Sequence, residues 1–498
     1  MMCKIPRNLL LIVIAGACCH LAAQQRSSIS WASYVTGDWS DAVRAVAVDR
    51  DGGVWVAGAS SSSLAISGPN QPYQAERKGK ADAFLAKLVP EAGGGTRVAF
   101  WTWFGGTGDE QVNAMALDSR GRVYLTGSTD STDLPRAGEA FQNQNGGEKD
   151  AFVAIFDPAL PGEFSLAFSS YYGGAKAEVA TALAVQPDGA VVVAGTTLSE
   201  ELPGVQGNLQ GVIRGGTDAF VIRFDPSIRN ALRYATYFGG TSSDYVTGVA
   251  VDRDSVIWIT GYTFSNDFPL TANGFQTSMR SSSDGFLAAI NPRRTGLDAH
   301  VYGSYFGGSD FEVPQQLAID SSGQFWISGY TFSKDFPITA DAVQSTNRGF
   351  ANAFLTRLDL SRPAGQAVVY STYLGGGFAE ILYGMALLGD GRVALAGYTM
   401  STDFPTAGKP AQGGLWTSFA DAFIAVLNTR SPGTAGLEYS TYFGGNYTDI
   451  AYGVAMDATG NLVAAGVTTS SDLPVTDGTS RSKPTPLNSG FVVKIAPR

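Results

Sequence analysis

One motif recurs six times along the sequence: an aromatic residue, a second bulky apolar residue and two glycines. A seventh, less regular copy is Tyr34-Val35-Thr36-Gly37, and successive copies stand 66 to 69 residues apart. A period of this length is typical of solenoids, arrays and propellers, in which each repeat packs only against its neighbours. The regular copies are Trp103-Phe104-Gly105-Gly106, Tyr171-Tyr172-Gly173-Gly174, Tyr237-Phe238-Gly239-Gly240, Tyr305-Phe306-Gly307-Gly308, Tyr373-Leu374-Gly375-Gly376 and Tyr442-Phe443-Gly444-Gly445.

Each repeat contains four short segments with the composition of β-strands. In the copy that begins at Tyr237 these are residues 249–252, 256–261, 284–291 and 300–306, separated by glycine- and aspartate-rich turns. Strand-forming residues alternate in them, and no stretch shows the 3.6-residue period of a helix. Four strands make one blade of a β-propeller.

The ends of the sequence predict how the repeats close. A twisted four-stranded sheet has two apolar faces, and a ring gives every sheet a neighbour on both sides. Residues 30–34 match the fourth strand of a repeat, whereas residues 490–495 match the third. We therefore predict an all-β fold, a seven-bladed β-propeller of four-stranded antiparallel blades, in which residues 29 to 36 complete the blade built from residues 451 to 495.

The first 23 residues have the layout of a signal peptide. Lys4 and Arg7 precede an apolar run from Leu9 to Ala17, and small residues end at Ala23. We predict export, to the periplasm, the cell surface or the medium, followed by a single domain over residues 24–498. Lipid attachment at Cys18 is the alternative, and no later stretch is long enough to span a membrane.

The mature sequence lacks the residues for several kinds of chemistry. All three cysteines lie within the first 23 residues, and His300 is the only histidine after them. Thiolate and histidine-cluster metal sites are excluded, and a Ser/His/Asp triad is disfavoured. Without Lys4 and Arg7 the chain has 32 basic and 44 acidic residues, a net charge of −12, so we expect no nucleic-acid partner. We expect a monomer without a cofactor.

Four motifs recur in the same order along the chain, with substitutions in individual copies, and the clearest repeats run from Tyr237 to Asn291 and from Tyr305 to Leu358. They are Tyr-Phe-Gly-Gly, Val-Asp-x-x-Gly, Thr-Gly-Tyr-Thr-x-Ser-x-Asp-Phe-Pro and Asp-Ala-Phe. This pattern resembles the bacterial SBBP family of seven-bladed β-propeller repeats and covers nearly the whole mature chain. The resemblance implies an exported or cell-surface protein and no shared activity. In that family adhesive or sorting domains often accompany the propeller, but none is expected here.

A carboxylate stands four residues after each glycine pair, or after Gly37 in the first copy. Because this segment joins the outer strand of one blade to the inner strand of the next, we expect the seven acids to surround one mouth of the central channel. Such a ring could hold Ca²⁺ or a cationic ligand. The structural alternative is that each acid accepts backbone N–H bonds from its own Gly-Gly turn or from the neighbouring blade. The acids are Asp41, Glu110, Glu178, Asp244, Glu312, Glu380 and Asp449.

Two functional classes fit these features. The first is a platform that binds a protein or glycan partner through the long segments between second and third strands, such as residues 73–80, residues 142–149 and Trp416. The second is a glycosidase or lyase that uses paired carboxylates. The acids repeat uniformly, whereas an enzyme needs unequal acids in one cleft, so the pattern favours the platform.

Overall fold

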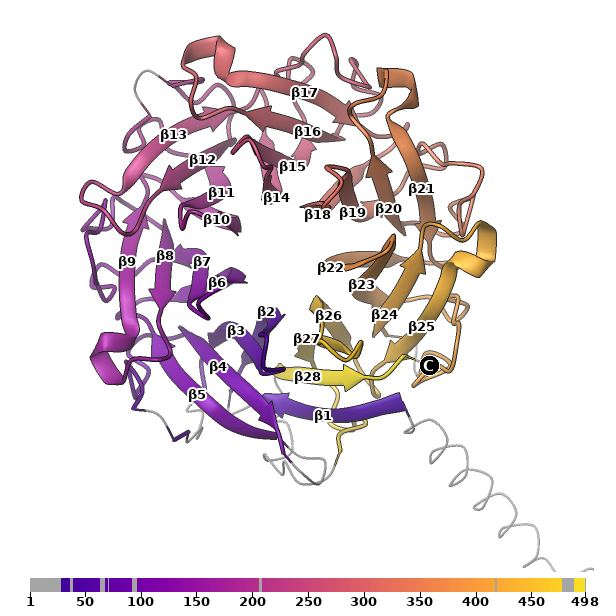
Figure 1. Cartoon of the computed structure of the whole chain (residues 1–498), viewed down its shortest axis with the longest axis horizontal. Helices are drawn as coiled ribbons and strands as arrows, with labels where there is room; N and C mark the ends of the chain where they lie inside the picture. The colour runs from indigo at the N-terminus through magenta and orange to yellow at the C-terminus, as the bar shows by residue number, and fades with distance from the viewer. Residues whose placement is uncertain are drawn as a thin grey trace, which may run out of the picture.

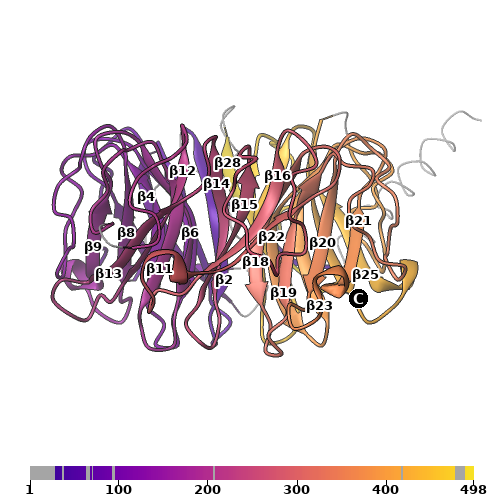
Figure 2. The same ribbon diagram turned by 90° about the horizontal axis from the view of Figure 1, so that it is seen from above.

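A computed structural model describes residues 28–35, 39–62, 68–69, 71–91, 96–205, 208–416, 419–476 and 488–497. Their strands form seven four-stranded antiparallel sheets arranged in a ring around a central channel (Figure 1). Seen from the edge, the strands run between two faces of a disc (Figure 2). The seven-bladed propeller predicted from the repeats is therefore confirmed.

The strand nearest the channel begins each blade, and the second strand pairs with it. The innermost strands are β2 (Asp41–Val48), β6 (Glu110–Leu117), β10 (Glu178–Val185), β14 (Asp244–Val251), β18 (Glu312–Ile319), β22 (Glu380–Gly389) and β26 (Asp449–Met456). The second strands are β3 (Val54–Ser60), β7 (Val123–Thr129), β11 (Val191–Thr197), β15 (Ile257–Thr263), β19 (Phe325–Thr331), β23 (Arg392–Thr399) and β27 (Leu462–Thr468).

The third and fourth strands lie farther from the axis. The third strands are β4 (Asp82–Pro90), β8 (Asp150–Phe156), β12 (Asp218–Phe224), β16 (Asp284–Ile290), β20 (Asn352–Leu358), β24 (Asp421–Asn428) and β28 (Ser489–Ile495). The outer strands are β5 (Thr96–Phe104), β9 (Leu166–Tyr172), β13 (Leu232–Phe238), β17 (His300–Phe306), β21 (Val368–Leu374), β25 (Leu437–Phe443) and β1 (Ile29–Val35). We number the blades 1 to 7 in the order of their innermost strands.

Four short 3₁₀ helices connect third to fourth strands: η2 (Gly162–Ser165), η3 (Gly296–Ala299), η4 (Ala364–Gln366) and η5 (Gly433–Gly436). They share one face of the disc, the turn face, with the tight turns between first and second strands. In those turns glycines such as Gly52 and Gly121 adopt φ of 79° and 83°, which a side chain would disfavour. The opposite face, the loop face, carries the Gly-Gly turns and the long segments between second and third strands.

The first strand in sequence closes the ring. β1 pairs antiparallel with β28, placing Trp31 opposite Lys494 and Tyr34 opposite Phe491. The Tyr34 hydroxyl also donates a hydrogen bond to the Ser470 carbonyl (3.1 Å) and accepts one from the Leu473 N–H (2.9 Å). The predicted completion of the last blade by residues 29 to 36 is thus confirmed over Ile29–Val35, while residues 36–38 lie outside the described residues.

The hydrophobic core is divided into seven clusters, one between each pair of neighbouring blades. Between blades 2 and 3, for example, Tyr124 and Phe220 are both fully buried. Burying a Phe side chain contributes about 1.5–3 kcal/mol, and both faces of each blade contribute such residues. This packing is what the apolar alternation of the strands predicted, and it holds the two faces of the disc rigidly in place.

Candidate functional site

The seven predicted acids each stand at the first position of an innermost strand, and none of them is exposed to solvent. In five junctions the N–H of the second glycine donates to the acid; Gly174, for example, donates to Glu178 at 2.7 Å. A hydroxyl from the neighbouring second strand also donates, as Thr197 does to Glu178 (2.6 Å). In blade 1 Ser60 and Ser62 bind Asp41. This geometry is that of the structural alternative, because the carboxylates turn into the frame.

Burial shifts the protonation of these acids. It raises the pKa of Glu110 and Glu312 to about 7 and that of Asp244 and Asp449 to about 6. Desolvation disfavours the charged form, and the surrounding hydroxyl and N–H donors only partly compensate. A paired-carboxylate mechanism needs acids that reach the scissile bond. Fully buried side chains cannot do so in this conformation.

A glutamine that the sequence analysis did not single out connects each loop to this frame. Gln210 donates its Nε2 to Asp218 (2.7 Å), the first residue of β12, and its Oε1 accepts the Gly239 N–H (3.1 Å). The same side chain recurs eight or nine residues before the third strand in blades 1 to 6. This spacing could have revealed it. The six are Gln74, Gln142, Gln210, Gln276, Gln344 and Gln412.

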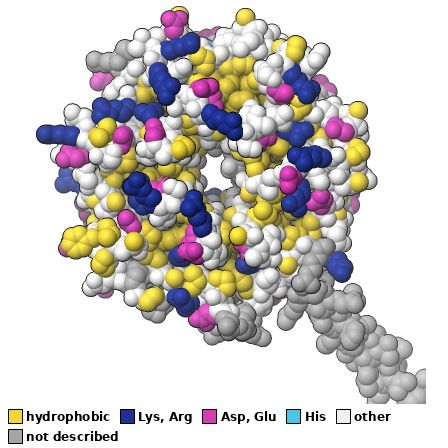
Figure 3. All heavy atoms as spheres, viewed as in Figure 1, with side chains coloured by type: hydrophobic (Ala, Val, Ile, Leu, Met, Phe, Trp, Pro, Cys, Tyr) yellow, Lys and Arg dark blue, Asp and Glu magenta, His cyan; other side chains and the backbone are white. Residues whose placement is uncertain are grey.

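The central channel holds a cavity of about 250 Å³ lined by the innermost strands, and its opening is visible in the space-filling view (Figure 3). None of the seven acids is among its lining residues. The lining is mostly neutral, and the Arg44 guanidinium lies 4.0 Å from the centroid of the Tyr452 ring, across the closure of the ring. Thr181 and Thr247 donate to carbonyls of the next blade at 2.7 Å. The lining therefore serves mainly to join the blades.

The loop face exposes a set of large aromatic side chains, which we call the aromatic rim. Each of these residues lies close to the end of a strand, and together they come from blades 1 and 4 to 7. Exposed fractions run from 36% for Phe311 to 69% for Phe350. The members of the rim are Trp39, Phe264, Phe311, Phe350, Phe378, Trp416, Phe419 and Tyr447.

Ring contacts organise the rim over blades 4 and 5. The ring centroids of Phe264 and Phe311 lie 6.1 Å apart. The centroid of the partly exposed Phe332 lies 6.4 Å from that of Phe311 and 5.0 Å from that of Phe350. The interplanar angles are 64°, 76° and 85°. Such edge-to-face contacts stabilise aromatic pairs and produce ridges and notches instead of one flat plane. On blades 6 and 7, Phe419 contacts Tyr447 at 5.8 Å.

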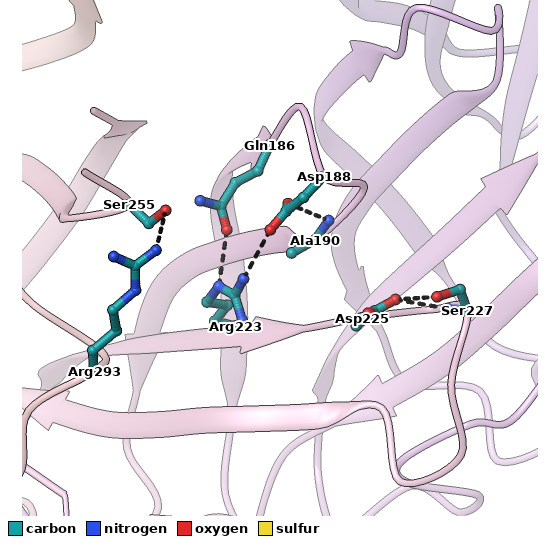
Figure 4. A network of polar contacts seen from close by, with 8 residues as sticks. All are labelled: Gln186, Asp188, Ala190, Arg223, Asp225, Ser227, Ser255 and Arg293. Carbon is teal, nitrogen blue, oxygen red and sulfur yellow. Dashed lines mark hydrogen bonds and ion pairs between the residues drawn. The ribbon is translucent and has the colours of Figure 1, made fainter. Parts of the chain in front are cut away.

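The turn face carries charged side chains that bind one another. Arg223 donates to Gln186 (2.8 Å) and approaches Asp188 at 3.4 Å, while Arg293 donates to Ser255 (Figure 4). A groove of about 540 Å³ between blades 1 and 2 contains the ion pair of Lys87 with Asp49 (2.6 Å). These charged and polar groups of the turn face are already paired with one another. They are therefore less available to a partner than the exposed side chains of the aromatic rim.

Two further features bear on function. Among the described residues, no three His, Cys, Asp or Glu side chains gather as a metal-binding group. In the same part of the chain, no helix has the length and apolar character needed to cross a membrane. Residues 1–23, including Cys18, lie outside the described residues, so the predicted signal peptide and the lipid attachment stay predictions.

Comparison with known proteins supports the repeat assignment. A family model for the SBBP β-propeller repeat matches residues 102–135 and 233–269, which confirms the resemblance drawn from the motifs. The regulatory protein FlaEY of Caulobacter vibrioides is 25% identical over 344 residues. That match covers 66% of this chain and 33% of FlaEY, so the chain spans about one third of its relative's length.

Solved structures are similar at lower identity. A protein of unknown function from Dyadobacter fermentans has a TM-score of 0.41 and 11% identity, over 94% of this chain and 99% of that one. The PQQ-bound aldose sugar dehydrogenase of Streptomyces coelicolor has a TM-score of 0.31 and 12% identity, over 74% and 93% of the two chains.

Proposed function

We propose that this chain, a seven-bladed propeller of the SBBP β-propeller repeat family, is an exported binding platform whose aromatic rim docks an apolar segment of a partner protein. The observation that carries the proposal is the gathering of eight exposed aromatic side chains on one face. Large exposed apolar patches are rare on monomers and usually mark interaction sites. Aromatic residues are enriched in the buried centres of protein interfaces.

The frame beneath the rim favours binding with little loss of entropy. Phe378 adjoins a Gly-Gly turn in which the Gly376 N–H donates to Glu380. Phe311 adjoins one in which the Gly307 N–H donates to the Gln276 side chain. Residues on a rigid scaffold need little ordering when a partner docks, and less of the interaction energy is then spent on fixing them. The loops are thus presented in one arrangement, as in other binding sites built on rigid frames.

Protein is favoured over glycan by the chemistry and angles of the rings. Most of the rim is Phe, which has no polar group to pair with a sugar hydroxyl. The edge-to-face angles leave notches that suit aliphatic or aromatic side chains better than a flat sugar ring. The relative from Caulobacter vibrioides is a regulatory protein by name, and regulation through protein binding is consistent with this role.

The alternative is a carbohydrate-active enzyme that uses paired carboxylates. The full burial of Glu110, Glu178 and the other five repeated acids weighs against it, because a substrate cannot reach them. No further observation on the described residues favours that alternative.

A displayed library of short random peptides tests the proposal directly. The full mature chain should enrich peptides rich in Phe, Leu and Trp, and the triple variant Phe311→Ser, Phe350→Ser, Phe378→Ser should lose that binding by at least tenfold, about 1.4 kcal/mol. A matched control places Phe164→Ser and Leu297→Ser on the turn face, where both side chains are also exposed. The control should bind as the unaltered chain does.

A glycan array with the same three proteins separates the partner classes. Equal loss of peptide binding in the rim variant and in the turn-face control would contradict the proposed site. Glycan binding that the rim variant loses, with no peptide enrichment, would replace the protein partner by a carbohydrate. Crosslinking from a photoreactive residue at position 350 then identifies the natural partner in extracytoplasmic extracts.

A further inference from the structure

At six blade junctions in the described part of the chain, two side chains face each other beneath the first glycine of the Gly-Gly turn. One is the first residue of a third strand and the other is the first residue of the next innermost strand. At Gly173 a β-carbon would lie 2.4 Å from Asp150 Oδ1 and 2.6 Å from Glu178 Oε2. Both residues of five such pairs are acids and fully buried: Asp82–Glu110, Asp150–Glu178, Asp218–Asp244, Asp284–Glu312 and Asp421–Asp449.

Blade 5 supplies an internal comparison, because its third strand begins with Asn352, whereas those of blades 1 to 4 and 6 begin with Asp. The Asn352 Nδ2 donates a hydrogen bond of 2.9 Å to Glu380 Oε2. Asn and Asp have the same shape, and the amide differs in bringing hydrogens to this contact. In the acid pairs a hydrogen at that place must come from a protonated carboxyl.

Several oxygens of the acid pairs have no hydrogen-bond partner in the described structure. They are Asp150 Oδ1, Glu312 Oε2, Asp421 Oδ1 and Asp449 Oδ1. A buried carboxylate oxygen without a donor is costly, and a buried pair of like charges costs more. A proton held between the two carboxyls supplies the missing donor and removes one of the two charges.

We infer that the pairs Asp150–Glu178 and Asp421–Asp449 each hold one shared proton near neutral pH, in the position that the Asn352 amide hydrogen occupies in blade 5. The proton lies under the Gly-Gly turn and joins the third strand of one blade to the innermost strand of the next. This inference does not depend on the proposed binding function.

The groups around each pair support the assignment. The pKa of Asp150 rises to about 7, chiefly through burial and with a contribution from Glu178; around this pair lie the phenols of Tyr171, Tyr172 and Tyr237. Burial and Asp449 likewise raise the pKa of Asp421 to about 7, and Asp472, Tyr34 and Tyr442 are the ionisable groups around that pair. By contrast, Arg77 lies near Asp82 and Arg214 near Asp218.

The sign of the pH dependence follows from these shifts. An acid whose pKa is higher in the folded than in the unfolded chain binds its proton more tightly when folded. The stabilisation is complete below the unfolded pKa and is lost as the pH rises toward 7. The ring is therefore most stable in mildly acidic solution. Above neutral pH the two carboxylates repel each other beneath the loop face.

Infrared spectroscopy and thermal unfolding test the inference with three variants. Between about pH 5 and about pH 9 the melting temperature of the unaltered chain should fall. In Asp150→Asn the fall should be smaller, and the carbonyl band of a protonated carboxyl should lose intensity at neutral pH. Asn352→Asp should steepen the fall and add intensity to that band. The exposed Asp254→Asn is the control and should change neither property.

Each outcome decides the question. The absence of a protonated-carboxyl band at neutral pH in the unaltered chain would overturn the inference, even if Asp150→Asn failed to fold. The inference would also be overturned if both variants, Asp150→Asn and Asn352→Asp, kept the carboxyl band and the pH dependence of the melting temperature of the unaltered chain. A band that disappears near pH 7 and moves with both substitutions establishes the shared proton.

Discussion

Blade 2 and blade 5 differ most sharply at three surface positions that correspond one to one. All three positions lie on the loop face, next to the buried frame. The first comes just before the innermost strand, the second just after the second strand and the third shortly before the third strand. In blade 5 all three side chains are phenylalanines in mutual contact, and in blade 2 all three are acids. The phenylalanines are Phe311, Phe332 and Phe350, and the acids are Asp109, Asp130 and Glu148.

The buried frame beneath these positions hardly changes. Glu110 and Thr129 of blade 2 are bonded as Glu312 and Thr331 of blade 5 are, at 2.5 and 2.7 Å. Repetition therefore conserves the geometry that builds the ring, whereas the exposed residues next to it vary from blade to blade. The proposed binding site therefore lies in the part of the loop face that varies between blades, whereas the repeated acids belong to the part that does not vary.

Exchanging the surfaces should have the largest effect. The variant Phe311→Asp, Phe332→Asp, Phe350→Glu copies the surface of blade 2 and should weaken peptide capture by about 100-fold, near 3 kcal/mol, because aromatic anchors dominate binding energy. Calorimetry of the selected peptide measures the loss. Stability should change by only about 1 kcal/mol, since all three side chains lie on the surface and Phe350 is 69% exposed. Retained affinity would show that blade 5 takes no part in binding.

Substituting the first glycine of the Gly-Gly turn should destabilise the fold equally in blades 2 and 5. A β-carbon on Gly173 would lie 2.4 Å from Asp150 Oδ1, and one on Gly375 would lie 2.1 Å from Glu380 Oε2. Gly173→Ala and Gly375→Ala should therefore each destabilise the fold by about 2–3 kcal/mol through overpacking. Urea unfolding measures this against Gly365→Ala, whose β-carbon meets nothing within 4 Å. Unequal losses would mean that the two junctions are built differently.

The frame was predictable from sequence because its signals are local and periodic. The glycine pairs and strand patterns recur at 66 to 69 residues, and the unmatched strands at the two ends predicted the β1–β28 pairing. The sequence could not determine whether the acids face the mouth of the channel. It places Glu178 at the start of a strand, but it does not show to which side of the strand the carboxylate turns. Gly173 and Gly174, which lack side chains, leave the space into which the carboxylate turns.

Apart from Trp416, which the sequence analysis named, the members of the rim escaped prediction, and the glutamines did so for a different reason. Phe264, Phe311 and Phe378 occupy non-equivalent positions in three blades, and only the closed ring brings them to one face. Gln142 and Gln412 stand eight and nine residues before the third strand, a recurrence that could have revealed them but does not show that they contact the Gly-Gly turn. Tertiary assembly, rather than local propensity, makes these residues neighbours.

The glutamines give a smaller and more discriminating test. Gln142 donates to Asp150 at 2.8 Å in blade 2, and Gln344 donates to Asn352 at 2.9 Å in blade 5. A hydrogen bond to a charged group is worth more than one to a neutral amide. Above neutral pH, where the shared proton has left Asp150, Gln142→Met should therefore cost about 2 kcal/mol and Gln344→Met about 1 kcal/mol. Urea unfolding at about pH 9 measures both. Equal costs would argue that Asp150 and Asn352 present the same charge.

The smallest effect is expected at the closure, where blade 1 meets blade 7. Arg44 lies 4.0 Å from the Tyr452 ring centroid there, whereas at the junction of blades 2 and 3 Asn113 donates to the Ala180 carbonyl at 2.9 Å. A partly exposed cation–π contact is worth about 0.5–1 kcal/mol, so Arg44→Leu should reduce the free energy of unfolding by that amount and leave peptide capture unchanged. A loss as large as that of Gly173→Ala would show that the ring depends on this contact as well as on the β1–β28 ladder, since backbone pairing alone would then not hold the closure.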